Sequence, residues 1–188
     1  MLTRTARRTL AGGTAAALMA GVLTVASPVH AAAGDPTVSS GTLSWGLKES
    51  FRSYIVGPIA HGSITVTAPA KDPGTAAGAT SFPNASGSWG SAGGAVSTRG
   101  SVTYFGHDGE LNFTISSPQL VATGTSARLI VDATDSDGVA YDDLAIADVD
   151  LTGKVTRSGG KVTITAAPAT LTADGEKLFK YGDAAMYP

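Results

Sequence analysis

The chain has 188 residues, with 13 Lys and Arg against 15 Asp and Glu, a net charge of -2 and no cysteine. The absence of cysteine excludes disulfide bonds, thiolate metal sites and iron–sulfur sites. The balance of charge argues against a nucleic-acid partner, because such partners need a basic surface that this chain lacks.

Residues 1–31 have the pattern of a secretory signal peptide. Three arginines precede a long apolar run, and the small residues Val29 and Ala31 fit cleavage after Ala31. The Arg7-Arg8 pair leaves open whether export uses the general or the twin-arginine route. We expect the mature chain to be secreted, or loosely associated with the cell wall. We also expect it not to span a membrane, because no later apolar run reaches the roughly 20 residues that a helix needs.

The mature chain suits one domain with a sizeable core. We expect a flexible leader at residues 32–41, followed by the domain at residues 42–188. The chain is expected to open the domain with an amphipathic helix, in which Ser44 is a candidate N-cap and Gly57-Pro58 is the stop. Apolar residues recur there every four positions, at Leu43, Leu47, Phe51 and Ile55.

Strand and turn signals follow the helix, so the predicted fold is mainly β (α+β), an antiparallel sheet with one N-terminal helix. Residues 63–68 alternate, and residues 96–117 are predicted to form a hairpin around His107, Asp108 and Gly109. Further strands are expected in "SARLIVDAT", in "LAIADVDLTGKV" and around a Gly-Gly turn in "RSGGKVTITAAPATLT". The segment rich in Ala, Gly and Ser at residues 69–94 is predicted to be a long loop.

Few residues offer catalytic or metal chemistry. The mature chain has two histidines, His61 and His107, too few for a His-rich zinc site. No G-x-S-x-G motif marks a serine nucleophile, so we do not expect an enzyme.

Carboxylates are clustered, and each cluster has two interpretations. The pairs Asp142-Asp143 and Asp148/Asp150 fit a solvated face or, less well, glycosidase acid–base work. "DATDSDG" suggests a surface turn or a calcium site, although it lacks the spacing and final Glu of an EF-hand loop.

Tyr54 and His107 remain without a role on these grounds. A tyrosine on a helix edge is more often core or interface than ligand, and a histidine in a hairpin turn is more often simply exposed. The residues alone therefore indicate a secreted β-rich domain with one helix.

Longer stretches of the chain resemble a known family. "LSWGLKESFRSYIVGPIAHGSITV" and "GSVTYFGHDGELNFTISSPQLV" resemble the opening and the central hairpin of the HtaA domain, a heme-binding module of Gram-positive heme uptake. "LAIADVDLTG" and "APATLTADG" resemble its later strands and tail, in the same order. The resemblance covers the chain from Leu43 to about Tyr181.

The resemblance implies a ligand and its partner. The family holds heme iron with a tyrosine at the end of the N-terminal helix, which matches Tyr54 in "FRSY". Its G-H-x-G histidine, which supports that tyrosine, matches His107 in "GHDG". The expected cofactor is therefore ferric heme b, bound without a covalent link.

The other heme contacts are weaker expectations. Ser50 could reach a propionate or the phenolate, and Arg52 fits a propionate partner or a solvated residue equally well. Phe51, Tyr104 and Phe105 could line the porphyrin, although a place in the core fits Phe51 at least as well. Alternation puts Tyr104 and Phe105 on opposite faces of their strand. Tyr181 lies near an aromatic position of the family, but this chain's tail, "LFKYGDAAMYP", is shorter than the family pattern.

The expected function is capture of ferric heme outside the cell by a free, hemophore-like carrier. Expected partners are heme, other heme-binding surface proteins and a heme transporter. The alternative is a structural or adhesive β module of the cell envelope that does not bind heme.

Overall fold

The computed structural model describes residues 35–74, 78–181 and 184–185, so the expected signal peptide, residues 1–31, lies outside the described residues. Its helices are α1 (Glu49–Ile55), the short 3-10 helix η1 (His107–Gly109) and α2 (Ala173–Leu178). Neither α-helix is long and apolar enough to cross a membrane. The strands are β1 (Thr37–Val38), β2 (Thr42–Trp45), β3 (Ser63–Thr67), β4 (Thr80–Pro83), β5 (Ser86–Gly90), β6 (Gly93–Ser97), β7 (Ser101–Gly106), β8 (Leu111–Thr123), β9 (Ser126–Thr134), β10 (Ala140–Asp150), β11 (Val155–Ser158), β12 (Lys161–Ile164), β13 (Ala169–Leu171), β14 (Lys180–Tyr181) and β15 (Ala184–Ala185).

Among these residues nine strands form one antiparallel sheet in the order β1-β5-β6-β8-β9-β10-β13, with β7 and then β3 also attached to β8. The long strand β8 serves two neighbours: its first half pairs with β7 and its second half with β6. A register shift between the halves, with Ser117 at a φ of 51°, bends the strand. The main sheet therefore changes direction at Ser117 and Pro118.

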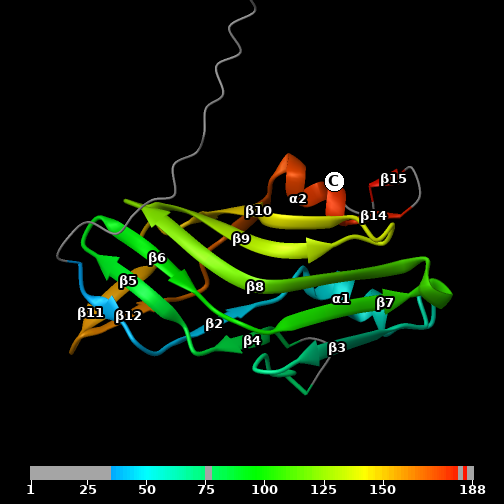
Figure 1. Ribbon diagram of the computed structural model, residues 1–188, viewed down its shortest axis with the longest axis horizontal. Coiled ribbons are helices and arrows are strands. Elements are labelled where there is room, and N and C mark those ends of the chain that lie inside the picture. The colour runs from blue at the N-terminus through cyan, green and yellow to red at the C-terminus, as the bar shows by residue number, and fades with distance from the viewer. Residues whose placement is uncertain (1–34, 75–77, 182–183, 186–188) are drawn as a thin grey trace, which may run out of the picture.

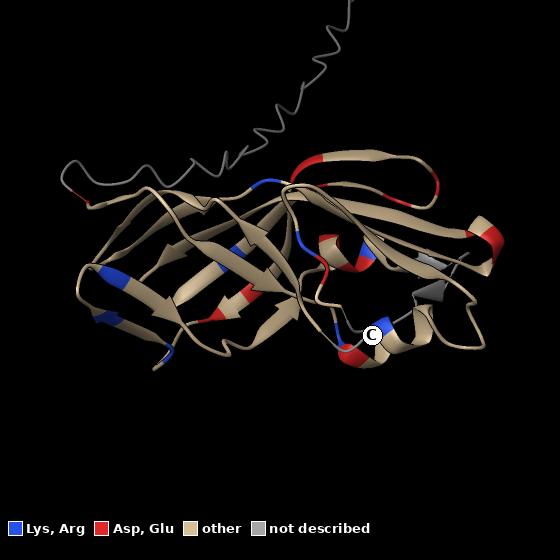
Figure 2. Ribbon diagram, turned by 90° about the horizontal axis from the view of Figure 1, so that it is seen from below, with Lys and Arg blue, Asp and Glu red and all other residues tan. Residues whose placement is uncertain are grey.

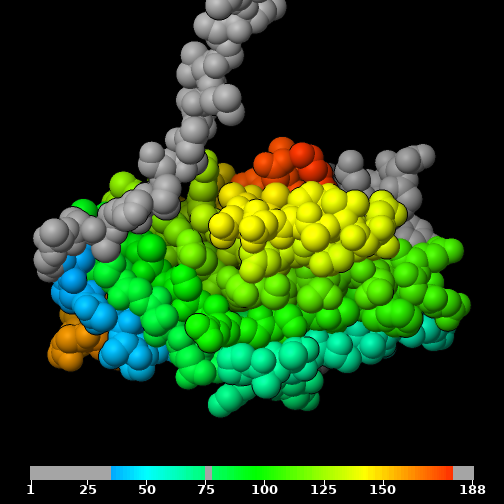
Figure 3. Space-filling model, in the orientation of Figure 1, coloured from blue at the N-terminus to red at the C-terminus, as the bar shows by residue number. Residues whose placement is uncertain are grey.

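The molecule is elongated along this sheet. β5, β6, β11 and β12 lie at one end, whereas η1, β14 and β15 lie at the other (Figure 1). Strands β3 and β7 to β10 form a continuous outer surface that hides α1 from this side (Figure 3). The short sheet of β2 and β4 lies on the inner side, together with α1 and α2 (Figures 1 and 2).

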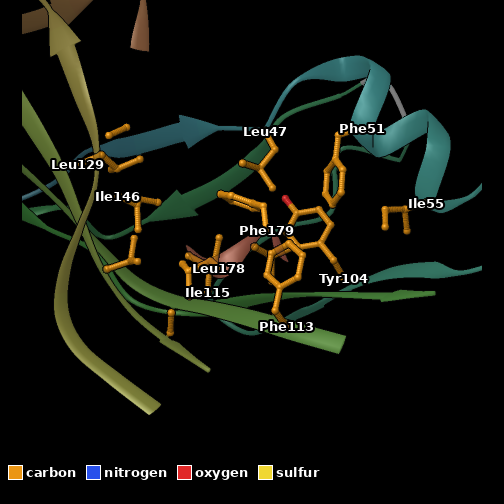
Figure 4. Close-up of a cluster of buried hydrophobic side chains, with 14 of the residues drawn as sticks. Leu47, Phe51, Ile55, Tyr104, Phe113, Ile115, Leu129, Ile146, Leu178 and Phe179 are labelled. Atoms are coloured by element: carbon orange, nitrogen blue, oxygen red, sulfur yellow. The ribbon is translucent and has the colours of Figure 1, made fainter. Parts of the chain in front are cut away.

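Both helices cover the inner face of the sheet. Phe51 and Ile55 of α1 and Leu178 of α2 belong to one buried cluster with residues of β7 to β10. The centre of this cluster is aromatic, as Figure 4 shows. Phe51 contacts the rings of Tyr104, Phe113 and Phe179 at centroid distances of 5.6, 6.0 and 6.0 Å. These contacts fix α1 to the sheet.

The predicted fold class is confirmed, and so is the hairpin around His107, since β7 and β8 pair on either side of η1. The predicted start of the helix is wrong. Residues 42–45 form β2, which pairs with β4, and the cap position of α1 is Lys48 instead of Ser44. Leu43 and Trp45 alternate with exposed residues, as in a strand. The helical spacing of apolar residues every four positions also includes Leu43, but the strand pattern is the one that the structure adopts.

Two other expectations also need correction. The predicted loop at residues 69–94 contains β4 and β5 and begins β6. Part of the expected leader belongs to the sheet, because β1 pairs with β5 and the Trp89 N–H donates to the carbonyl of Pro36 at 3.0 Å. Small polar residues carry little alternation of hydrophobicity, so these strands depend on partners distant in sequence.

The hydroxyl of Tyr104 is buried without a hydrogen-bond partner among the described residues. Burial raises the pKa of Tyr104 to about 12, and the nearby charge of Arg52 opposes the shift. An unfolded phenol ionises near pH 10, so between about pH 10 and 12 the folded chain holds a proton that the unfolded chain has lost. The stability that this group contributes below pH 10 is therefore lost as the pH rises through this window.

We predict that Tyr104→Phe removes this alkaline loss, which at about pH 11 is worth about 1.4 kcal/mol of the free energy of unfolding. At about pH 8 the variant should be at least as stable as the parent, because the deleted hydroxyl has no partner. Urea denaturation at about pH 8 and about pH 11 measures both effects. An equal alkaline decline in the parent and the variant would contradict the assignment.

Candidate functional site

Tyr54 lies in the last turn of α1. On the inner side of this helix Phe51 and Ile55 are buried, whereas Tyr54 is half-buried at its edge. The helix ends directly afterwards, where the Gly57 N–H donates to the Tyr54 carbonyl at 3.1 Å and Pro58 follows. The phenol is thus held at the edge of a helix whose neighbouring side chains, Phe51 and Ile55, are fixed in the core.

His107 begins the turn between β7 and β8. His107, Asp108 and Gly109 all have positive φ, at 51°, 54° and 103°, so the chain turns through three left-handed residues. Gly adopts this conformation freely, and His and Asp adopt it more readily than most other residues. The His107 N–H donates to the carbonyl of Ala60 at 2.8 Å, which ties this turn to the loop after α1.

The two side chains meet although 53 positions separate them in sequence. A hydrogen bond joins the phenol oxygen of Tyr54 and Nε2 of His107, and their ring centroids are 5.7 Å apart. An imidazole nitrogen donates or accepts according to its tautomer, so this bond can deliver a proton to the phenol oxygen or take one from it. The expected hydrogen bond between the two residues is therefore present.

Exposed apolar side chains occur close in sequence to each residue of the pair. Ile59, in the loop after α1, is 69 % exposed, and Phe105, two residues before His107, is 39 % exposed. Val56 at the end of α1 is also exposed. Val56 and Ile59 were not among the predicted site residues, because neither belongs to a periodic pattern. The available signal was a large apolar residue, Ile59, in the loop directly after Pro58, where a polar residue is more common.

The structure places the other predicted contacts in different settings. Ser50 is exposed one turn before Tyr54, and Phe105 points away from the core while Tyr104 points into it, as alternation predicted. Tyr181 is in β14, but its side chain lies outside the described residues.

Two expected contacts are corrected. Phe51 is 2 % exposed and belongs to the aromatic core, which is the second of its two predicted settings. Arg52 is 7 % exposed, and its guanidinium donates to the carbonyl of Leu47. This bond turns the guanidinium back toward the start of α1, beside Gly46, where any Cβ would lie 2.6 Å from Arg52 Nη1. Arg52 therefore supports the helix instead of facing a propionate.

The carboxylates of the predicted clusters lie in hydrogen-bonded turns or on exposed strand positions. Asp135 accepts from the Val139 N–H and the Tyr141 hydroxyl, both at 2.8 Å, which makes "DATDSDG" a hydrogen-bonded turn. Asp148 is exposed and pairs with Arg128 at 3.3 Å, whereas Asp150 accepts from the Thr152 N–H. In the described part of the chain no group of three His, Asp or Glu side chains is placed to hold a metal ion.

A separate hollow lies away from this pair. A cleft of about 510 Å³ opens near the start of α1, lined by residues that include Trp45, Leu47 and Phe179. Neither Tyr54 nor His107 lines it. Tyr54 and His107 are the residues that could bind a metal-containing ligand, and neither lies in the cleft. The candidate site is therefore the surface around this pair.

The backbone next to the site is closely packed at Gly62. A Cβ added to this residue would lie 1.8 Å from the carbonyl oxygen of Phe105, well inside contact distance. We predict that Gly62→Ala destabilises the fold by about 1–3 kcal/mol, because the loop after α1 must move away from β7. Urea denaturation beside Ser63→Ala, an exposed neighbour, measures this cost. A Gly62→Ala variant as stable as this control would show that the two backbones do not touch.

The fold and the site together define a class of protein, an antiparallel β domain that presents a tyrosine–histidine pair at its surface. The family model described as Htaa matches residues 40–186, so the chain belongs to the HtaA family. No curated protein matches the chain significantly.

Solved structures support this membership. The C-terminal domain of HtaA from Corynebacterium glutamicum superposes with a TM-score of 0.66 at 26 % identity, over 76 % of this chain and 87 % of that one. The N-terminal domain of the same protein gives 0.61 at 29 % identity, over 80 % and 92 %. The heme binding protein HtaB from that organism gives 0.57 at 25 % identity, over 76 % and 85 %.

Proposed function

We propose that the chain binds ferric heme at its surface through the Tyr54 phenolate and passes it to a cell-surface uptake system. The observation that carries the proposal is the hydrogen bond between Tyr54 and His107, with exposed apolar side chains close in sequence to each. Membership of the HtaA family supports it, as does the similarity to HtaB, a heme binding protein.

The chemistry of the pair suits ferric iron. A phenolate is a hard, anionic oxygen donor, and tyrosine is one of the residues that proteins use to hold heme iron. A free phenol ionises only near pH 10, so at neutral pH it needs a neighbouring cation or hydrogen-bond donor that favours the charged form. In this proposal the iron supplies the positive charge, and His107 donates from Nε2 to the phenolate oxygen.

The apolar neighbours give the proposed site its second component. A porphyrin is a wide apolar plate, and burying apolar area contributes about 25 cal/mol per Å². Phe105, Val56 and Ile59 would contact such a plate, whereas they are exposed to water in the free chain. Large exposed apolar side chains near a candidate ligand residue are available for such a contact.

We also propose that the chain is secreted and acts as a heme carrier. A secreted chain that holds iron by one anionic ligand at an open surface suits a carrier, not an oxygen-activating enzyme. Protonation of the phenolate or reduction of the iron would weaken the bond, which favours release to a partner.

We predict that the chain of residues 32–188, which includes every described residue, binds hemin in a saturable titration followed by absorbance. The complex should show a Soret band and the charge-transfer bands of a ferric tyrosinate. Tyr54→Phe should lose the charge-transfer bands and bind hemin at least 100-fold more weakly, because the iron loses its ligand. Tyr104→Phe, the same change at a buried tyrosine, is the control and should bind as the parent does.

Failure of a folded parent to bind hemin would favour the alternative, a structural or adhesive module. Unchanged bands in Tyr54→Phe would show that another residue holds the iron.

We predict that His107→Asn weakens hemin binding by about 10–100-fold without abolishing it, because the phenolate keeps the iron but loses its hydrogen-bond donor. Asparagine tolerates the left-handed backbone of this position, so the effect should come from the imidazole. Asp108→Asn, the neighbouring left-handed residue, is the matched control. Equal affinities for His107→Asn and Asp108→Asn would exclude a role for the imidazole.

A further inference from the structure

Three turns come together at the end of the molecule that carries β5, β6, β11 and β12 (Figure 1). The turns β5–β6, β8–β9 and β10–β11 meet there around a hollow of about 320 Å³ (Figure 1). We call this hollow the turn pocket; its lining includes Trp89, Ser91, Thr125, Gly153 and Arg157. Its volume lies at the lower end of the range of small-molecule sites.

Backbone hydrogen bonds hold the three turns together. The Gly124 N–H donates to the carbonyl of Ala92 at 2.7 Å, which joins the first turn to the second. The Leu151 N–H donates to the carbonyl of Thr125 at 2.8 Å, which joins the second turn to the third. The turn pocket is therefore a built feature of the fold and not a gap between independent loops.

The turn pocket offers hydrogen-bond donors. Trp89 is 5 % exposed, and its indole N–H is buried without a hydrogen-bond partner among the described residues. The indole therefore belongs to the wall of the turn pocket, where its fluorescence can respond to a bound ligand. Arg157 donates from Nη2 to the carbonyl of Gly90 at 2.9 Å, which positions the guanidinium at the pocket with further N–H groups.

The charged residues around the turn pocket are mostly basic, which favours an anionic ligand. The β11–β12 hairpin and its flanks carry Lys154, Arg157 and Lys161, and no acidic residue occurs between Asp150 and Asp174. Figure 2 shows basic positions on the hairpin at this end of the molecule. One carboxylate lies nearby, because Asp35 Oδ1 packs against the α-carbon of Gly90, but it makes no ion pair with Arg157 within the described residues.

We propose that the turn pocket binds an oxyanion, a carboxylate or phosphate group, carried by a ligand no larger than about one sugar ring. Arg157 binds the oxyanion through its charge and its planar set of N–H groups. Trp89 forms part of the wall beside the bound group. The site is independent of the proposed heme function, because the two share no residue.

The test uses the fact that the chain has two tryptophans. In the chain of residues 32–188, Trp45→Phe leaves Trp89 as the single tryptophan, so its fluorescence reports on the turn pocket alone. Glucuronate and inorganic phosphate are titrated at constant ionic strength, with uncharged glucose as the reference of matched size. We expect a saturable change of Trp89 emission with at least one of the two anions and none with glucose.

Two variants separate the pocket from general attraction by positive charge. Arg157→Met should weaken anion binding at least tenfold, because it removes a charged donor that lines the pocket. Lys161→Met removes the same charge from the same hairpin outside the lining, and it should bind within about twofold of the parent. Calorimetric titration of the chain with both tryptophans repeats the measurement if Trp45→Phe does not fold.

The results decide both the proposal and the class of oxyanion. Saturable binding of phosphate but not glucuronate assigns the pocket to phosphate groups, and the reverse assigns it to carboxylates. The absence of saturable binding by either anion overturns the proposal. Equal losses in Arg157→Met and Lys161→Met also overturn it, because binding would then follow net charge alone.

Discussion

Phe51 contacts three aromatic rings that come from β7, β8 and the end of α2. The helix that carries it, α1, has only seven residues and lacks a side-chain N-cap, so it would not be stable in isolation. Its position therefore depends on the burial of Phe51 and Ile55 and on the bond from Arg52 to Leu47. Tyr54 lies one residue before Ile55, so these contacts also decide where the phenol is held.

The second constraint is the contact between the loop after α1 and the end of β7. Ala60 accepts the N–H of His107, and Gly62 has no side chain where the Phe105 carbonyl approaches. These contacts involve main-chain atoms, so they bring Tyr54 and His107 together independently of the side chains that meet. The aromatic core positions one partner of the pair, and the backbone contact positions the other.

The sequence predicted those parts of the fold whose signals are local. The hairpin around His107 was found because alternation and a Gly-containing turn stand together in one segment, and η1 and β8 follow from it. The start of α1 was missed because Leu43 fits both a period of four and a period of two. Only the pairing of β2 with β4, about 40 positions away, decides between them.

The candidate site could be predicted from local patterns only in part, as the fold could. No pattern in the residues joins Tyr54 to His107, since nothing local relates positions 53 apart; the family resemblance suggested the pair, and the structure shows their hydrogen bond. Arg52 was misplaced for a physical reason, because a charged residue is expected in solvent unless its donors find a partner inside. The carbonyl of Leu47 is that partner, and no sequence pattern reveals it.

The position of the pair also bears on how the proposed carrier would work. An enclosed pocket gives a ligand a large buried area but requires the fold to open before release, whereas the Tyr54–His107 pair lies outside the large cleft. At this surface the iron–phenolate bond would supply most of the specificity, and the exposed apolar side chains would supply contact area that a partner can reach. In the proposed carrier, affinity would then depend on the charge state of a single oxygen, so control of that oxygen by His107 would be enough to retain or release heme without any large movement of the sheet.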